Sequence, residues 1–169
     1  MSLSLALSLP EHSKKSSVVW AMLLSDVFHH VAEAIADQTA RSKAEVSAVL
    51  ENCFREVIDS DRGIRTGVVR PFWERSPALD APEVDAESDS VEKVRILFLP
   101  DSIRVLVRVG MWLPNDEEAV WGNILYDLAS LIAEQISTGD DASRLRTGLF
   151  NDTLGYVHKP STTYTGTYY

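Results

Sequence analysis

Two similar stretches, VWAMLLSDV at residues 19–27 and VWGNILYDL at residues 120–128, constrain the fold of this chain more than any other feature. A shift of 101 positions places residues 18–36 over residues 119–137 without a gap, and seven of the nineteen positions are then identical. Each stretch follows an alternating apolar segment and precedes a second helical pattern. Similarity at a fixed offset is typical of a duplicated unit. Convergence of two amphipathic helices on one pattern is the alternative explanation.

Each copy carries apolar residues at the spacing of one helix face. These residues are Trp20, Leu24, Val27, Val31 and Ile35 in the first copy and Trp121, Leu125, Leu128, Ile132 and Ile136 in the second. Ser16 or Ser17 is predicted to cap the first helix and Asn115 or Asp116 the second, because short polar side chains accept hydrogen bonds from the unpaired N–H groups of a helix start. We expect both tryptophans to be buried.

A second helix is predicted in each copy. In the first copy the segment SKAE at residues 42–45 is a capping box, which marks a helix start. The apolar face that follows comprises Val46, Val49, Leu50, Cys53, Phe54 and Val57. In the second copy the helix is predicted to begin near Asp141. Gly148 and Gly155 indicate a weaker and shorter helix there, because glycine lowers helix propensity.

Alternation of apolar and polar residues with a period of two predicts strands. Leucines alternate with small residues over residues 2–9, and a hairpin is predicted around the turn PDS at residues 100–102. The alternating apolar positions of this hairpin are Val94, Ile96, Phe98, Ile103, Val105, Val107 and Val109. The segments IRTGVVRPF at residues 64–72 and KPSTTYTGTYY at residues 159–169 predict a closing strand for each copy.

These patterns together predict an α+β fold. We expect a tandem duplication of a β(β)αα(β) unit, with antiparallel sheets, helices packed on one face and a pseudo-two-fold relation between the copies. Residues 1–75 would form the first unit and residues 91–169 the second. Residues 76–90, SPALDAPEVDAESDS, contain two prolines, five acids and no basic residue, and are predicted to be a flexible linker.

The phrase W-G-x-x-L-x-D-[VL] after an apolar hairpin resembles a small bacterial family known as domain of unknown function 5076. Residues 93–169 carry the fuller resemblance, through RILFLPDSIRVLVRVGMW, AVWGNILYDLASLIAEQ, Phe150 and the closing pair Thr165 and Gly166. Residues 1–73 resemble a degenerate copy, with Ala21 where the motif has glycine. The resemblance implies a helix-plus-sheet fold and no activity, because none is assigned to the family.

Composition narrows the classes of partner. A net charge of −9 disfavours nucleic acids and anionic membranes, which bind basic surfaces. The single cysteine, Cys53, excludes an internal disulfide and a cysteine-based zinc site, and is predicted to fill the core. No apolar run is expected to reach the ~18–20 residues of a membrane span. The start at residues 1–10 lacks the basic residues of a signal peptide, so we expect a cytoplasmic protein.

Acidic and histidine residues are the first candidates for chemistry. Asp26 and Glu33, like Asp127 and Glu134, lie seven apart on a helix face opposite the apolar stripe. A solvated face, or contacts of the aspartates to neighbouring loops, is the favoured interpretation, with acid–base catalysis or a partner contact as alternatives. The pair at residues 29–30, His-His, is interpreted as surface histidine. We predict no catalytic residue, no metal ligand and no cofactor.

Arginine and aromatic residues near the end of the first copy indicate a binding surface. Arg65, Arg70, Phe72 and Trp73 are the candidate partner contacts, because this combination is typical of protein hot spots and of nucleic-acid sites. Docking of the acidic linker or of the other copy onto the arginines, and binding of an anion, are the alternatives.

The sequence favours a non-catalytic protein-interaction or regulatory module, and a chaperone-like role is one version of this hypothesis. The partner is expected to be another protein, and the chain a monomer or weak homodimer. The alternative is a small-ligand binder or an unusual enzyme with a site in the cleft between the two copies.

Overall fold

The fold is mostly helical with small two-stranded sheets, which confirms the α+β class. The computed structural model describes residues 2–7, 14–58, 66–71, 93–99, 102–112, 116–136 and 140–157. Along the chain the elements are β1 (Ser2–Leu7), α1 (Lys14–Thr39), α2 (Lys43–Ile58), β2 (Thr66–Pro71), β3 (Val94–Leu99), β4 (Ser102–Val107), α3 (Glu117–Ile136) and α4 (Asp140–Tyr156).

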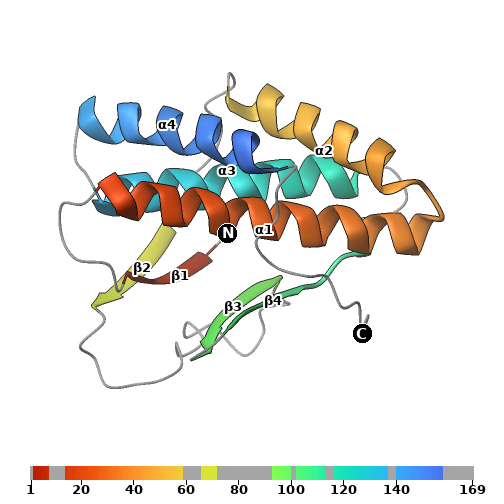
Figure 1. Ribbon diagram of the computed structural model, residues 1–169, viewed down its shortest axis with the longest axis horizontal. Coiled ribbons are helices and arrows are strands. Elements are labelled where there is room, and N and C mark those ends of the chain that lie inside the picture. The colour runs from red at the N-terminus through yellow and green to blue at the C-terminus, as the bar shows by residue number, and fades with distance from the viewer. Residues whose placement is uncertain are drawn as a thin grey trace.

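The four helices pack together on one side of the strands (Figure 1). Helices α1 and α3 run through the middle, with α4 above them at one end and α2 at the other. The most extensive helix contacts join α2 to α3 and α4 to α1. Helix α2 therefore packs chiefly on α3, and α4 packs chiefly on α1, so each contacts the long helix from the other half of the chain.

Local sequence signals explain most helix boundaries. The capping box is confirmed: the Glu45 carboxylate accepts hydrogen bonds from the backbone N–H (3.1 Å) and hydroxyl (2.8 Å) of Ser42. Asp116 directly precedes α3, and its carbonyl accepts a hydrogen bond from the Val120 N–H at 3.0 Å. Helix α1 begins earlier than predicted, at Lys14. The predicted caps Ser16 and Ser17 are therefore wrong, because both residues lie within the first turn.

Helix α4 is longer than its glycines predict. It spans 17 residues, against 16 for α2, so the expectation of a shorter helix is wrong. Leu149, Phe150 and Thr153 are buried where α4 packs on α1 and α3. Burial of a large apolar side chain contributes about 1.5–3 kcal/mol. That contribution exceeds the penalty of about 1 kcal/mol for a glycine within a helix.

The two sheets differ in strand direction. Strands β3 and β4 form the predicted antiparallel hairpin, in which Leu99 pairs with Ser102 and Val94 with Val107. Strands β1 and β2 pair in parallel, so the expectation of antiparallel sheets is wrong for this pair. The connection through α1 and α2 supplies the long crossover that parallel strands require. The closing strand predicted at residues 159–169 lies outside the described residues.

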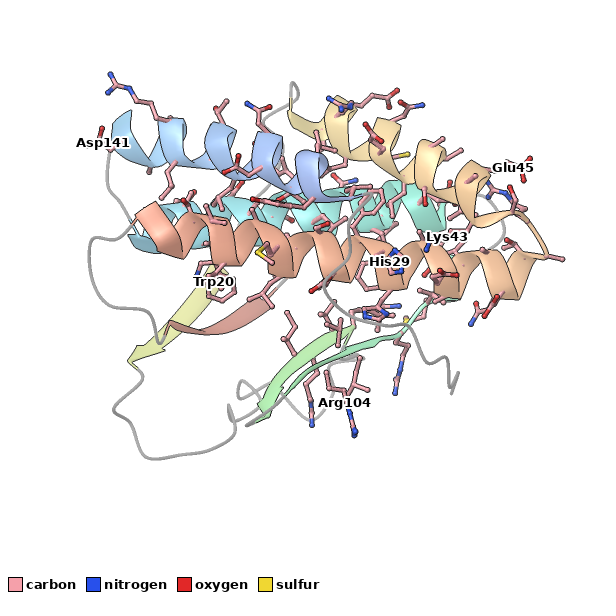
Figure 2. The ribbon with its side chains drawn as sticks, in the orientation of Figure 1. Trp20, His29, Lys43, Glu45, Arg104 and Asp141 are labelled. Carbon is pink, nitrogen blue, oxygen red and sulfur yellow. The ribbon has the colours of Figure 1, made fainter. Side chains whose placement is uncertain are left out.

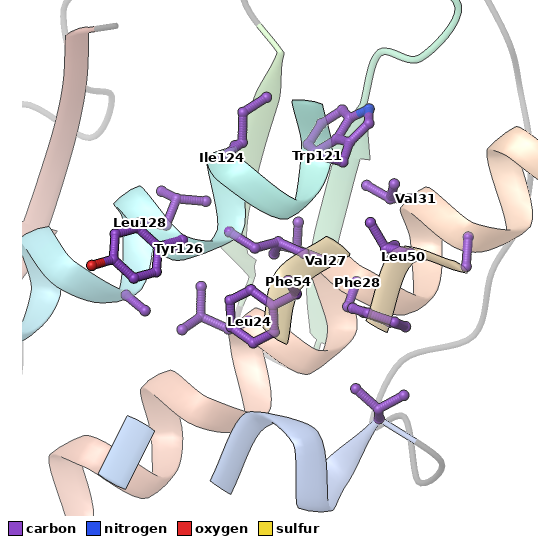
Figure 3. Packing of buried hydrophobic residues seen from close by; sticks show 14 of the residues in the cluster. Leu24, Val27, Phe28, Val31, Leu50, Phe54, Trp121, Ile124, Tyr126 and Leu128 are labelled. Carbon is purple, nitrogen blue, oxygen red and sulfur yellow. The ribbon is translucent and has the colours of Figure 1, made fainter. Parts of the chain in front are cut away.

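The core forms where all four helices meet. Figure 3 shows side chains of α1, α2 and α3 converging on one another, among them Val27, Phe54 and Trp121. The Phe150 ring of α4 stacks on Tyr126, with ring centroids 5.2 Å apart, and meets Phe54 edge to face at 5.3 Å. Aromatic pairs in these geometries stabilise a core beyond the burial of their area.

The two repeated tryptophans are buried, as predicted. Trp121 has no exposed surface and Trp20 exposes 8%. Figure 2 shows Trp20 on the side of α1 toward the strands. Cys53 is half-buried in α2, and burial raises the pKa of its thiol. A protonated, half-buried thiol agrees with its predicted place on the packed face of that helix.

Residues Ser17–Thr39 of α1 are long and apolar enough, by length and composition, to cross a membrane. The expectation that no segment reaches this length is therefore wrong. The buried share of the apolar window is 78%, because α1 packs against all three other helices and β4. A core helix of a soluble protein satisfies the same criteria, as does a signal sequence near the N-terminus.

Gly122 marks a close approach of α3 to α2. A Cβ added at this position would lie 3.0 Å from the Cβ and backbone carbon of Cys53 and from the backbone nitrogen of Phe54. Backbone atoms cannot rotate away as a flexible side chain can. The spacing of these two helices therefore depends on a residue without a side chain.

The Gly122→Val variant is expected to lose about 1–3 kcal/mol of unfolding free energy through overpacking. Gly148→Val is the matched control, because a Cβ at Gly148 would meet no atom within 4 Å. The control should change stability by less than about 0.5 kcal/mol. Urea unfolding followed by circular dichroism measures both, and equal losses would contradict the assigned close approach.

Candidate interaction surface

The predicted partner contacts fall largely outside the structure's described part. Arg65, Phe72 and Trp73 are not among the described residues. Arg70 belongs to β2 and pairs with Ala6 of β1, but its side chain is not described. These four residues therefore stay a predicted contact.

The candidate acidic residues of α1 and α3 differ in their exposure to solvent. Asp26 is buried, which excludes the solvated interpretation for this residue. Glu33 and Asp127 are half-buried, whereas Glu134 is exposed. Asp26, Asp127 and Glu134 each take part in polar or electrostatic interactions. The seven-residue spacing thus places the acids in different environments, rather than creating one shared carboxylate site.

One of the two histidines of α1, His29, contacts α2. His30 is buried and His29 is half-buried, so the surface interpretation is wrong for His30. His29 Nε2 lies 3.1 Å from Lys43 Nζ and 3.7 Å from a Glu33 oxygen, and Lys43 donates a hydrogen bond to Glu33. Burial, and then the charge of Lys43, lower the pKa of His29. Burial, and then His29, lower the pKa of His30. His29, Lys43 and Glu33 thus form a cluster that connects the two helices.

A pocket of about 200 Å³ lies between α3 and α4. Its lining residues are Ser130, Ala133, Glu134, Ala142, Ser143 and Arg146. Both helices belong to the second half of the chain, so this pocket is not the cleft predicted between the halves. That cleft stays a prediction. Within the described residues, no three His, Cys, Asp or Glu side chains are grouped to hold a metal ion.

The start of α3 holds a buried carboxylate that organises the connection from β4. Glu117 has no exposed surface. Its oxygens accept hydrogen bonds from the backbone N–H groups of Gly110 (2.9 Å) and Trp112 (2.8 Å). The indole N–H of Trp121 donates a third at 3.1 Å. Gly110 has a φ of +98°, a left-handed conformation that favours glycine. The loop after β4 is thereby fastened to the first turn of α3.

Two further contacts lie near the start of α3, where the loop from β4 meets the helix. The guanidinium of Arg41, in the turn after α1, donates a hydrogen bond to the buried carboxylate of Glu118. Lys93, just before β3, places Nζ 3.9 Å from the centroid of the Trp112 ring. Burial lowers the pKa of Lys93, while the charge of Glu117 opposes this effect. The hairpin is thus attached to the helices at its open end.

The two faces of the hairpin differ in chemistry. Side chains at alternate positions turn inward and pack against the helical core, namely Val94, Ile96, Val105 and Val107. The outward positions on β4 and its end are Arg104, Leu106 and Arg108, all exposed, and Arg95 of β3 is exposed opposite Leu106. Figure 2 shows Arg104 pointing away from the helices. We call these four residues the Arg–Leu face.

Leu106 stands in the middle of the Arg–Leu face. Arg104 of β4 and Arg108, just past the end of β4, lie two residues before and after it, and Arg95 pairs with it across the hairpin. Its exposed fraction, 46%, is high for a leucine within a strand. Three arginines around an apolar side chain contrast with a net charge of −9 for the whole chain. The Arg–Leu face is therefore the candidate interaction surface.

The comparisons with known proteins bear on this part of the chain. Residues 78–149 match the family described as Domain of unknown function (DUF5076). The predicted resemblance to this family is therefore confirmed, with a match that begins and ends earlier than the predicted range 93–169. The match contains the hairpin, the Arg–Leu face, α3 and the first half of α4, and it lies outside residues 1–73. Neither the curated proteins nor the solved structures contain a match to the chain.

Replacing the buried carboxylate should destabilise the fold. The Glu117→Ala variant leaves three N–H donors without their acceptor and is expected to lose about 3–5 kcal/mol of unfolding free energy. The exposed residue Glu56 supplies the control, because Glu56→Ala should cost less than about 0.5 kcal/mol. Chemical denaturation measures both variants. Similar stabilities for the two proteins would show that the Glu117 network does not hold this junction together.

The histidine cluster predicts a pH dependence of stability. The pKa values of His29 and His30 are lowered in the folded protein, so the unfolded chain takes up protons first as the pH falls below about 6.5. The free energy of unfolding should be level above this pH and decrease below it. Lys43→Met should make the decrease smaller, because the Lys43 charge helps to lower the pKa of His29. Denaturation curves between about pH 5 and 7 test this, and an unchanged slope in the variant would contradict it.

Proposed function

We propose that this protein is a non-catalytic protein-interaction module that binds its partner through the Arg–Leu face. The observation that carries the proposal is the exposed Leu106 with arginines on three sides. Protein interfaces are enriched in arginine, and they bury apolar side chains at the centre of a more polar rim. Another protein is accordingly the proposed class of partner, rather than nucleic acid or membrane.

Attachment of the hairpin supports this proposal. A binding surface loses less entropy on association when its side chains stand on a backbone that is already ordered. The inward valines pack on the core, and Glu117 fastens the loop that follows β4. The outward side chains therefore project from an ordered support.

The polar clusters of the helices support a non-catalytic role. Lys43 of α2 forms an ion pair with Glu33 of α1. Arg41, in the turn between α1 and α2, forms an ion pair with Glu118 of α3. Each pair joins two elements of the fold. This structural use accounts for the charged residues of these clusters without invoking chemistry.

A tandem duplication with a pseudo-two-fold relation belongs to the same proposal. A pseudo-two-fold axis between α1 and α3 would relate the contact of α2 with α3 to the contact of α4 with α1, and both contacts are extensive. Buried, half-buried and exposed positions also occur in the same order along residues 18–33 and residues 119–134. It differs only at the pairs Asp26/Asp127, His29/Ser130 and Glu33/Glu134. Both observations favour duplication over convergence of two helices.

The duplication supports a further part of the proposal, a protein that acts as a monomer or weak homodimer in the cytoplasm. Two units in one chain supply the contact that a single unit would obtain by pairing with a second copy. Most of the apolar stretch of α1 is buried against other elements, as in a core helix. A chaperone-like role is one version of such a module.

Site-specific photo-crosslinking tests the proposed function. A photoreactive amino acid at position 106, introduced in the native host, is expected to form covalent adducts with a partner protein. Val49 of α2 is the matched control, because it is a similarly exposed apolar residue (40%) and α2 lies on the side of the helices away from the hairpin (Figure 1). Adducts at both positions, or at neither, would rule out the Arg–Leu face as the binding surface.

A further inference from the structure

We propose that the partner presents an extended acidic segment, in which an apolar side chain lies between two carboxylates. This inference rests on the proposed function and names the chemistry that the Arg–Leu face recognises. Its basis is the order of residues along β4 and just beyond its end, where the exposed Leu106 lies between the exposed Arg104 and Arg108.

Strand geometry sets the spacing that a partner must match. Arg104 and Arg108 are four residues apart, which is about 14 Å along a strand. An extended segment with acidic residues at positions one and five, and an apolar residue at position three, has the same spacing. Its carboxylates would reach the two arginines while its apolar side chain covers Leu106. Guanidinium groups bind carboxylates with charge-assisted, often bidentate hydrogen bonds.

Charge favours a short acidic segment over a long polyanion. The net charge of −9 repels a nucleic acid over its whole length, whereas a short segment meets mainly the local arginines. Nearby charges dominate at physiological ionic strength, because salt screens interactions beyond ~8 Å. The recognition is therefore local to the hairpin.

The apolar component also favours a protein. Single-stranded nucleic acids bind to aromatic side chains on which their bases stack. The outward side chains described on the hairpin include no aromatic residue, and Lys93 lies over the nearby Trp112 ring. Leu106 offers no stacking surface to a base. It does offer an apolar contact to an aliphatic side chain, with Met111 exposed in the loop that follows β4.

The test uses the intact protein and a labelled peptide that repeats Glu-Thr-Val-Thr, followed by fluorescence anisotropy. This peptide places acidic and apolar side chains alternately on one face at the required spacing. The same peptide with glutamine in place of glutamate is the probe control, and should bind at least about tenfold more weakly. Equal affinity for the two peptides would overturn the inference.

Two double variants test the position of the charges. Arg104→Gln with Arg108→Gln should weaken binding of the acidic peptide by about tenfold. Arg55→Gln with Arg144→Gln is the matched control, since it removes the same charge from exposed positions on α2 and α4. The control should change the affinity by less than about twofold. Similar losses in the two variants would overturn the inference, because net charge alone would then explain binding.

Other anionic partners are separate arms of the same experiment. A single-stranded oligonucleotide of equal charge and vesicles of phosphatidylserine should both bind more weakly than the acidic peptide. Tighter binding of either would overturn the inference in favour of nucleic acid or membrane. Crosslinking at position 106 to a protein, combined with failure of the acidic peptide, would overturn the partner chemistry while leaving the proposed function intact.

Discussion

The buried carboxylate of Glu117 is the interaction on which the rest of this structure depends. A fully buried carboxylate is costly unless hydrogen bonds compensate its lost hydration. Three N–H groups supply that compensation, two from the loop after β4 and one from Trp121. The start of α3 is a favourable place for a negative charge, because unpaired N–H groups carry partial positive charge there. One side chain thereby connects the hairpin, the loop and the first turns of α3.

The packed helices give this junction its support. Helices α2 and α4 pack on the long helices α3 and α1, and aromatic rings from three helices meet at Phe150. Gly122 allows α3 to approach the backbone of α2 at Cys53. The inward valines of the hairpin complete this core, and the outward residues Arg104, Leu106 and Arg108 are exposed. Alternation along a strand thus separates a face packed on the core from an exposed face.

Periodicity in the sequence was enough to predict the helices, the hairpin and the burial of both tryptophans. Period and capping are local properties, so short segments carry them. The parallel pairing of β1 with β2 is not local, because it depends on the path of the chain through two helices. The burial of Asp26 and His30 is not local either, because neighbouring elements cover the side of α1 opposite its predicted stripe. The length of α4 likewise depends on packing that compensates its glycines.

The candidate surface shows the same division. The same alternation implies that Leu106 and the three arginines lie on the face opposite the valines, but the prediction of the hairpin rested on its apolar positions alone. By itself the sequence determined the helices and the two chemistries of the hairpin, since these follow from residue order. Only the tertiary structure decided which face packs on the helices and which meets solvent. Burial requires a partner surface, and that surface comes from helices distant in the chain.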